Sequence, residues 1–433
     1  MEKIRLDIVN ETVYYEKLDN GLDVYVLKKD NFHSSFATFM TNFGGKDVEF
    51  IPINEDKMVK MPSGIAHFLE HKLFEQESGE SVHEFYKKSG SYVNAMTSYR
   101  STKYIFKGPK NFKENLNYLL DYVQSPYFTD KNVEKEKGII LEEARMDLDN
   151  PYRLFSEAVL KNLFRSSVYE HTIIGSMDDI KSITKEDLYR CYNSFYHPSN
   201  MALLIVTNED ENEIIELVKN NQKKKQFKND FKIIKKEYEE TEKVRTKKEI
   251  IYGNVNETRV CYSLKFKLSS FNASKIEVLD YFTIFFDIVV GLLSNFNLKL
   301  KEDKIIKKDI DFNVMTEKVK DEEYVIFSLS TFTEKTNKFV SLLKEQLLKK
   351  DYNKELFDLY KKTIISDLNY QFNSVEGIMH FLTDEYEFYK KVSNDIIKTE
   401  SNLNYDRFKE ITDKINTDNE SIVIMKKNKK TML

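Results

Sequence analysis

The sequence contains no tryptophan and only two cysteines among its 433 residues. Cys191 and Cys261 stand far apart and in no CxxC pair, so they provide neither a disulfide framework nor a thiolate metal site. No histidine or acidic residue stands at a telling distance from either one, and we interpret both as buried apolar residues rather than nucleophiles. This cysteine usage is typical of a reducing compartment.

Signals for export or membrane insertion are also missing. Residues 1–15 carry charges throughout, without the run of roughly 7–15 apolar residues that a secretory signal needs. The most apolar stretch, 281–293, contains Asp287 and is shorter than the roughly 20 residues that span a bilayer, so we interpret it as a buried helix. We therefore expect a cytoplasmic protein with no membrane span.

Neither sign of charge is in large excess, because 67 Lys and Arg residues face 71 Asp and Glu residues, for a formal net charge of −4. This balance gives no basic field for holding nucleic acid, and the 26 Tyr and 31 Phe residues lack accompanying basic clusters. We therefore expect no nucleic-acid partner. The 41% hydrophobic and 32% charged residues are typical of a globular protein with real cores.

A chain of this length should divide into at least two domains of roughly 200 residues. The charged segment 221–247 has no glycine or proline and predicts a linker between domains at 1–220 and 248–433. The second half repeats the strand and helix order of the first. The main expected elements are strands at 22–30, 34–43, 92–98, 102–108, 201–207, 260–268, 322–332 and 421–427, and helices at 63–76, 111–124, 130–149, 152–164, 185–196, 274–300 and from 336 onward.

One predicted helix carries the residues of a metal site. His67 and His71 are four residues apart, so on a helix their imidazoles share one face and can reach one zinc ion. Glu70 points to the same side, where a carboxylate can take a proton from the attacking water without being a ligand. This is the chemistry of a metallopeptidase. The alternative is a helix with two surface histidines and an incidental carboxylate.

A catalytic zinc usually keeps three protein ligands and an open fourth position, so a further ligand must come from elsewhere in the chain. The helix at 130–149 offers two adjacent carboxylates, and helical geometry turns Glu143 inward and Glu142 toward water. Glu136, two turns earlier, either bonds the far nitrogen of a ligating histidine or is an ordinary exposed glutamate. The expected inward stripe consists of Glu136, Ile139, Ile140, Glu143 and Met146.

These motifs, taken in order, resemble the M16 (pitrilysin-like) metallopeptidases, whose inverted-zincin signature is HxxEH followed about 70 to 80 residues later by a metal-binding glutamate. Here Glu143 follows His71 by 72 positions. The sequence is most similar to the two-domain bacterial members, in particular the YmfH-like branch. The segments that carry the resemblance are LDNGLDVY at 18–25, GIAHFLEH at 64–71, YVNAMTS at 92–98, EKGIILEE at 136–143 and FYHPSNMALLIV at 195–206.

The resemblance implies an α+β fold of two homologous α/β domains, each a mostly antiparallel sheet flanked by helices. It implies one Zn²⁺ per chain at the HxxEH site. In the family, the strand that matches 92–97 lies beside the zinc and pairs with the backbone of a peptide substrate. Asn94 and Ala95 are therefore expected substrate contacts; the alternative is a plain sheet strand with a polar kink.

The sequence departs from the family in its second half. Members with a complete site carry an Arg and a Tyr, in a segment resembling LREKGLAYSV, that grip the substrate carbonyl. In the matching stretch 300–312, Lys301 stands at the Arg position and Lys307 at the Tyr position. The resemblance therefore favours a heterodimer, with a homologous subunit that lacks HxxEH and supplies Arg and Tyr, over a homodimer.

The leading hypothesis is a zinc-dependent endopeptidase subunit that cleaves unfolded or short peptides inside a closed chamber, including a precursor or leader peptide. One alternative is a non-catalytic structural or assembly subunit of the same fold. Another is a metal-binding regulatory protein without turnover, which would have no use for Glu70 as a base.

Overall fold

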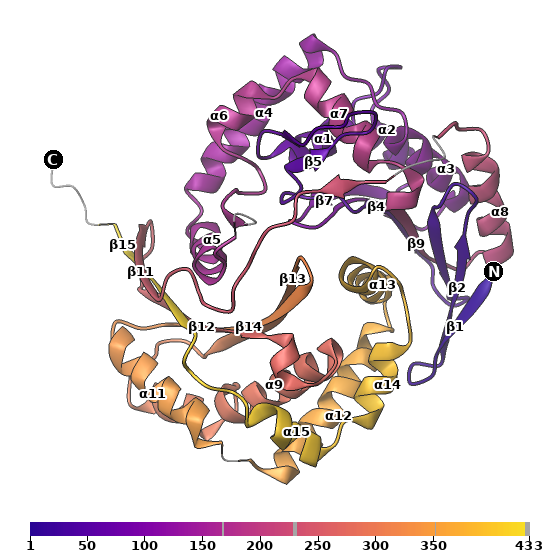
Figure 1. The fold of residues 1–433 in the computed structure, drawn as a ribbon. Coiled ribbons are helices and arrows are strands. Elements are labelled where there is room, and N and C mark those ends of the chain that lie inside the picture. Colours follow the sequence, from indigo (N-terminus) through magenta and orange to yellow (C-terminus); the bar gives the residue numbers. More distant parts are fainter. Residues whose placement is uncertain (167–168, 228–231, 351, 429–433) are drawn as a thin grey trace. The chain divides into compact units, whose positions relative to one another are not determined.

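The computed structural model describes residues 1–166, 169–227, 232–350 and 352–428 (Figure 1). Among these residues, no helix is long and apolar enough to cross a membrane. The predicted domain limits at 220 and 248 stay a prediction, and residues 228–231 of the predicted linker lie outside the described ranges. The chain forms two compact units: unit 1 comprises Met1–Ala144, His171–Lys236 and Asp367–Asn394, and unit 2 comprises Arg145–Glu170, Glu237–Ser366 and Asp395–Leu433.

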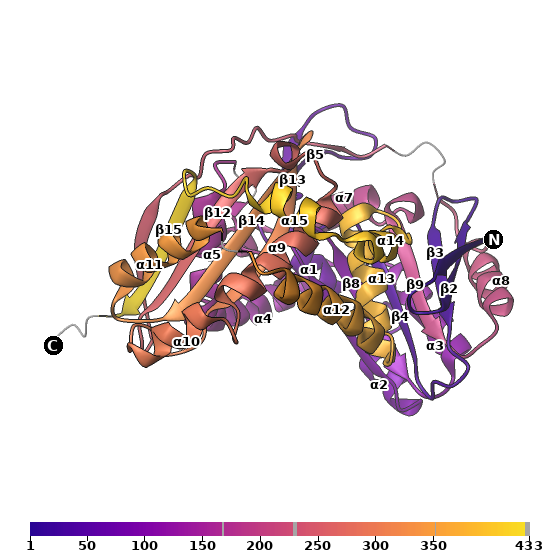
Figure 2. The same ribbon diagram turned by 90° about the horizontal axis from the view of Figure 1, so that it is seen from below.

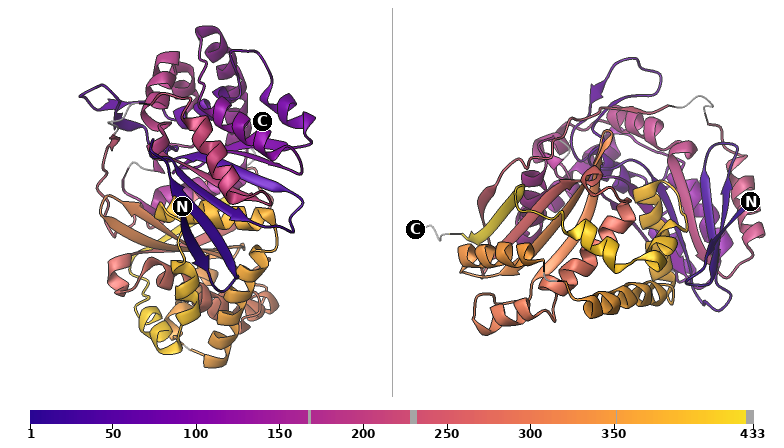
Figure 3. Two further views of the ribbon diagram at one scale, coloured as in Figure 1. Left: turned by 90° about the vertical axis from the view of Figure 1, so that its right-hand side faces the viewer. Right: turned by 60° about the horizontal axis from the view of Figure 1, so that its bottom comes forward.

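Unit 1 is built on a seven-stranded sheet with the order β1-β2-β3-β9-β4-β8-β7. Only the β3–β9 pair is parallel. The hairpin β1–β2, in indigo in Figure 3, forms one edge, and β7 forms the other. The strands are β1 (Glu2–Leu6), β2 (Glu11–Lys17), β3 (Asp23–Lys28), β4 (Ser35–Thr41), β7 (Tyr92–Thr97), β8 (Thr102–Gly108) and β9 (Met201–Thr207).

Helices cover both faces of this sheet, and the alternation of side chains along β8 separates the two faces. Tyr104 and Phe106 of β8 join the core beneath α1 (Ile65–Lys72). Lys103 and Lys107 point to the opposite face and form ion pairs with α13 (Val375–Tyr389), which also packs on β4 and β9. The other elements of unit 1 are β5 (Glu49–Ile51), β6 (Val59–Lys60), α2 (Val82–Lys88), α3 (Phe112–Val123), α4 (Asp130–Leu148, continuing into unit 2), α6 (Met177–Ser182), α7 (Lys185–Phe195), α8 (Glu211–Gln222) and β10 (Ile234–Lys235).

Unit 2 is built on a five-stranded sheet with the order β11-β15-β12-β14-β13, in which only β11–β15 is parallel. Tyr262 and Leu264 of β12 face the core formed with α9, whereas Cys261 faces Phe155 of α5 (Pro151–Leu163) on the other side. Figure 2 shows α9 and α11 on the sheet of this unit. Its further elements are β11 (Lys248–Gly253), β12 (Arg259–Lys267), α9 (Lys275–Val290), α10 (Asn295–Glu302), β13 (Asp311–Val319), β14 (Glu322–Phe332), α11 (Thr336–Lys349), α12 (Lys354–Gln371), α14 (Asp395–Asn402), α15 (Tyr405–Thr412) and β15 (Glu420–Lys427).

The two sheets share one topology, because β3-β9-β4-β8-β7 and β11-β15-β12-β14-β13 have the same order and the same pattern of directions. Each unit also contains a helix from the other half of the sequence: α13 belongs to unit 1, and α5 belongs to unit 2. The predicted fold class, α+β with two similar halves of mostly antiparallel sheet and helices, is confirmed.

One predicted element is wrong. The sequence pattern predicted a single helix at 274–300, but the structure has α9 and α10 with a break at Gly291–Ser294. The backbone N–H of Gly291 bonds the carbonyls of Phe286 and Asp287 and closes α9, and the Ser294 side chain caps α10 by accepting from the N–H of Asn297. Apolar periodicity continues across the break, which is why the pattern alone missed it.

Candidate metal centre

Helix α1 presents both predicted histidine ligands on one side. Ile65, Phe68 and Leu69 are buried and hold the helix against the core of unit 1. His67 and His71 are therefore turned toward α4, with ring centroids 4.6 Å apart. Two imidazoles separated by one helical turn are thus brought side by side, as their spacing in the sequence requires.

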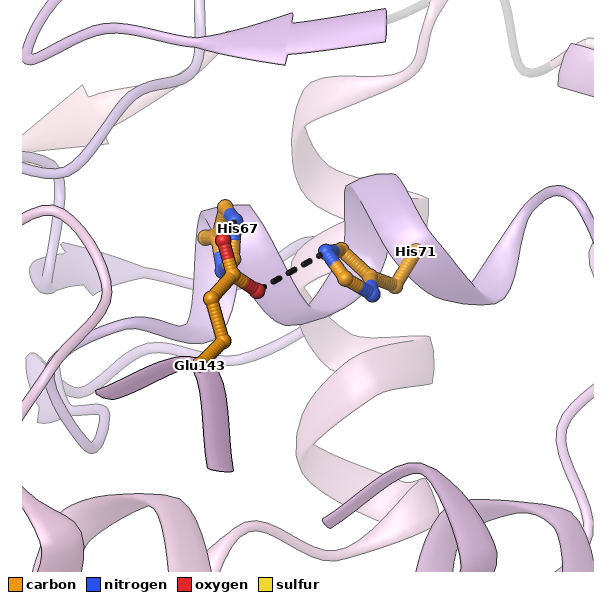
Figure 4. Close-up of side chains that lie close together, drawn as sticks. All are labelled: His67, His71 and Glu143. Carbon is orange, nitrogen blue, oxygen red and sulfur yellow. Dashed lines mark ion pairs between the residues drawn. The ribbon is translucent and has the colours of Figure 1, made fainter. Parts of the chain in front are cut away.

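Glu143 of α4 completes a group of three potential ligands (Figure 4). Its Oε1 lies 3.7 Å from Nε2 of His67, and its Oε2 lies 3.5 Å from Nε2 of His71. These distances are long for hydrogen bonds. They match the edge of about 3.4 Å that separates two ligand atoms in a tetrahedral zinc site with bonds of about 2.1 Å. The donor set of two imidazoles and one carboxylate therefore fits zinc. Among the described residues, this is the one group of three or more such side chains close enough to share an ion.

Glu136 is hydrogen-bonded to His71. Its Oε1 lies 2.9 Å from Nδ1 of the imidazole. Burial raises the pKa of Glu136, but the hydrogen bond and charge of His71, together with the charges of Lys72 and Lys135, lower it more, so the net pKa is lowered. Burial lowers the pKa of His71, but the hydrogen bond and charge of Glu136, together with the charges of Glu70 and Glu143, raise it more, so the net pKa is raised. A proton held on Nδ1 leaves the lone pair of Nε2 directed toward the three-ligand group, which is the orientation a metal ligand needs.

Glu70 lies on the same helix, beside the two histidines, and is 8% exposed. Burial raises its pKa and the charge of Glu143 adds to that effect, while the hydrogen bond from Thr97 and the charge of His71 oppose it; the net pKa is raised. The Thr97 hydroxyl donates to Oε2 of Glu70 at 2.6 Å. The sequence pattern did not single out Thr97, although strand alternation places it on the inward side together with Val93 and Ala95.

The expected substrate strand is β7, at the open edge of the sheet. Asn94 is exposed and donates to the Tyr92 hydroxyl at 2.8 Å, whereas the Ala95 side chain is buried and leaves only its backbone for contact. A cavity of about 680 Å³ is lined by Asn94 and also by Glu70, His71, Phe74 and Glu136. One predicted metal ligand, His71, the predicted base Glu70 and the predicted peptide contact Asn94 therefore border one space.

The predicted inward stripe of α4 is wrong in part. Ile139 is 49% exposed and Met146 is 75% exposed, whereas Ile140 and Ala144 are buried. The buried face of α4 is centred on these two residues, so Glu143 lies at its border with its side chain 42% exposed. A carboxylate that must reach a metal ion cannot be covered by core side chains, which agrees with the partial exposure of Glu143. The apolar pattern of the sequence could not distinguish the border of the buried face from its centre.

The fold and the site define a protein of two α+β units, one of which carries a His-His-Glu centre of the inverted-zincin kind. The family described as Insulinase (Peptidase family M16) matches residues 59–176, and Peptidase M16 inactive domain matches residues 182–364. The two matches together cover more than half of the chain. The chain belongs to the M16 peptidase family.

Individual relatives are described as zinc proteases or M16-like peptidases. A Bacillus subtilis protein described as an uncharacterized zinc protease, YmfH, is 44% identical over 268 residues, which are 62% of each chain. A Rickettsia felis protein described as an uncharacterized zinc protease is 26% identical and aligned over 49% of its length. The chain thus spans less than two thirds of these relatives. A solved structure of an M16-like peptidase from Alicyclobacillus acidocaldarius is 26% identical with a TM-score of 0.86, covering 96% of this chain and 98% of the other.

Proposed function

We propose that this chain is a zinc-dependent endopeptidase subunit that cleaves unfolded or short peptides. The observation that carries the proposal is the convergence of His67, His71 and Glu143 at zinc-ligand spacing, with Glu70 buried beside them. Relatives described as zinc proteases support zinc, and we propose one ion per chain. A bound zinc ion would polarise a peptide carbonyl and lower the pKa of a water molecule.

The protein groups then have distinct roles. Glu70 accepts a proton from the attacking water at Oε1, because Oε2 already accepts from Thr97, and returns the proton to the leaving amine. Glu136 positions His71 through Nδ1. Burial raises the pKa of Glu70, which favours the form that has taken a proton from water.

The substrate proposal rests on β7. An edge strand offers unpaired backbone groups to an extended peptide, and strand addition tolerates many side-chain sequences. Asn94 would contact the peptide with its side chain and Ala95 with its backbone. Such pairing needs an extended segment, so unfolded chains and short peptides fit, including a precursor or leader peptide cut inside a closed chamber in the cytoplasm.

Unit 2 supports the proposal of a partner. Lys301 lies 2.6 Å from Asp309, and Lys307 lies 3.3 Å from Glu257, so both lysines are engaged by carboxylates of their own unit. Lys304 has φ of 51° at the position where the family segment has Gly, which supports the alignment. Neither lysine has the form of the Arg and Tyr that grip a substrate carbonyl. We propose that a homologous subunit without HxxEH supplies those groups in a heterodimer.

The test is cleavage of quenched-fluorescent peptides by zinc-loaded protein, alone and mixed with a co-purifying homologue, with Glu70→Gln as the control. Cleavage in the mixture only, abolished by Glu70→Gln while zinc binding stays normal, is the expected result. Cleavage by the chain alone would contradict the heterodimer. Absence of cleavage in both preparations would favour a non-catalytic assembly subunit.

A further inference from the structure

Glu70 is held by one strand residue outside its own helix. Its carboxylate is almost fully buried, and the hydroxyl of Thr97 is its one hydrogen-bond donor among the described residues, at 2.6 Å. The buried rings of Tyr104 and Tyr196, whose hydroxyls bond each other at 2.8 Å, lie near enough for the charge of Glu70 to add to the effect of burial in raising their pKa values. Among the described residues, Thr97 is therefore the one side chain that orients the carboxylate through a hydrogen bond.

We propose that Thr97 is a positioning residue for the general base, a role that rests on the proposed peptidase function. Glu has three side-chain torsions, and in a buried site a single charge-assisted bond to Oε2 restricts the side chain to the rotamers that keep this bond, which leaves Oε1 to accept the proton. Thr97 touches neither metal nor substrate in this role and acts through Glu70.

The position of Thr97 in the sheet connects this role with the substrate. Thr97 is the last residue of the edge strand β7, opposite Thr102 of β8. A peptide that adds to β7 extends the sheet beside the strand that carries this hydroxyl. Peptide binding and the orientation of Glu70 therefore depend on the same strand. A peptide that stabilises β7 would also stabilise the position of the Thr97 hydroxyl.

The test compares two substitutions at one position. Thr97→Val keeps the β-branched shape and removes the hydroxyl, and Thr97→Ser keeps the hydroxyl. We expect Thr97→Val to lower kcat by roughly 10- to 100-fold, because a buried carboxylate loses its hydrogen bond, with KM and zinc affinity unchanged. Thr97→Ser should stay within about threefold of the parent, since its hydroxyl can still donate. Crystal structures of the two metal-free variants should show Glu70 displaced in the first and retained in the second.

Thr41→Val is the matched control. The Thr41 hydroxyl donates to the backbone carbonyl of Phe195 at 2.6 Å and lies on β4, two strands from β7, so its loss should lower stability and leave kcat unchanged. Equal losses of kcat in Thr97→Val and Thr41→Val, or in Thr97→Val and Thr97→Ser, would assign the effect to strand packing and overturn the proposal. An unmoved Glu70 carboxylate in Thr97→Val would overturn it as well.

Failure of this inference differs from failure of the proposed function. If Glu70→Gln abolishes cleavage and Thr97→Val does not reduce cleavage, the role of Thr97 is contradicted and the peptidase function is not. If no preparation cleaves peptide, the peptidase proposal falls, and the position of Glu70 in the two crystal structures still decides whether Thr97 holds it. A further check is the double variant, since Thr97→Val should cost nothing more once Glu70→Gln has removed the base.

Discussion

In unit 1, α1 is the first helix after β4; it turns His67 and His71 toward α4 (Figure 4), and its Glu70 accepts a hydrogen bond from Thr97 of β7. In unit 2, α9 is the first long helix after β12, and it buries Phe282 and Phe286 in the core. The sheets around these helices share one strand order. The same topology therefore carries the proposed metal centre in one unit and a packed aromatic core in the other, so chemistry depends on the side chains placed on the fold and not on the fold itself.

The comparison extends to buried charge. Unit 1 keeps one of its buried acids, Glu70, beside histidines and a hydroxyl. Unit 2 contains a fully buried ion pair, in which Lys265 lies 2.9 Å from Glu240 and between the rings of Phe164 and Tyr324. The first arrangement places charged groups at a cavity, where the proposed function uses them, and the second neutralises them inside a core. Four experiments test this division between the units, from the largest expected effect to the smallest.

Removing one ligand from unit 1 should abolish the metal centre. Because loss of an outer partner of a metal ligand costs about 10- to 100-fold in affinity, Glu143→Gln should weaken zinc binding by more than about 100-fold and remove cleavage. The adjacent exposed Glu142→Gln is the matched control and should bind zinc normally. Zinc titration by competition with a chelating dye measures both. Equal zinc affinity in the two variants would show that Glu143 is not a ligand.

Breaking the buried pair of unit 2 should affect stability and leave zinc binding intact. Lys265→Met leaves Glu240 charged and unpaired in the core, which should cost about 3–5 kcal/mol of unfolding free energy. The double variant Lys265→Met/Glu240→Gln should recover most of the loss, because no buried charge then remains unpaired. Denaturant unfolding provides the values. If Lys265→Met were as stable as the parent, the ion pair would not contribute to the free energy of unfolding.

Unit 2 also contains an acid that should make its stability depend on pH. Burial raises the pKa of Glu400 from 4.5 to about 7, and its Oε2 has no hydrogen-bond partner in the described part of the chain. The folded state therefore holds a proton that the unfolded state releases, so stability should fall as pH rises from about 4.5 to about 7 and then level off, by about 3 kcal/mol in total. Glu400→Gln should flatten this part of the curve and be the more stable protein at pH 8. If the parent and Glu400→Gln showed the same dependence of stability on pH, the raised pKa could not be assigned to Glu400.

The smallest expected effects come from a capping box in each unit. Thr184 caps α7 in unit 1 with Asp187, and Ser274 caps α9 in unit 2 with Glu277. Replacing either cap by Ala should cost about 1 kcal/mol, because one helix N–H loses its acceptor. Thermal unfolding with and without zinc measures each change. Zinc affinity should stay constant in both variants, and a loss confined to Thr184→Ala would show that α7 also supports the metal centre through α1.

Sequence reasoning could predict what local spacing determines. Four-residue spacing placed His67 and His71 together, and the apolar strands and most helices followed from periodicity of two or 3.6 residues. The bond between Thr97 and Glu70 joins a strand to a helix 27 positions away, and no local pattern contains it. The exposure of Ile139 and the break at Gly291 depend on what packs against each helix, which a single sequence does not specify.

The sequence also could not predict the exchange of two helices between the units, in which α5 joins unit 2 and α13 joins unit 1. The pattern of an amphipathic helix shows that one face will be buried but does not indicate which sheet that face will cover. Both helices have the helical periodicity of apolar residues, which would fit the sheet of their own half of the sequence equally well. Their assignment to the other half's sheet appears only in tertiary contacts, such as those of α13 with β4 and β9.

That exchange has a consequence for synthesis on the ribosome. The Tyr386 hydroxyl donates to Asp23 across 363 positions, and Lys390 donates to Asn42 across 348. Unit 1, which carries the proposed metal ligands, therefore stays incomplete until almost the whole chain has been translated. During that interval the faces of β4 and β9 lack their covering helix, and closure of so long a loop is slow. The nascent chain thus depends on protection from aggregation for most of its elongation time.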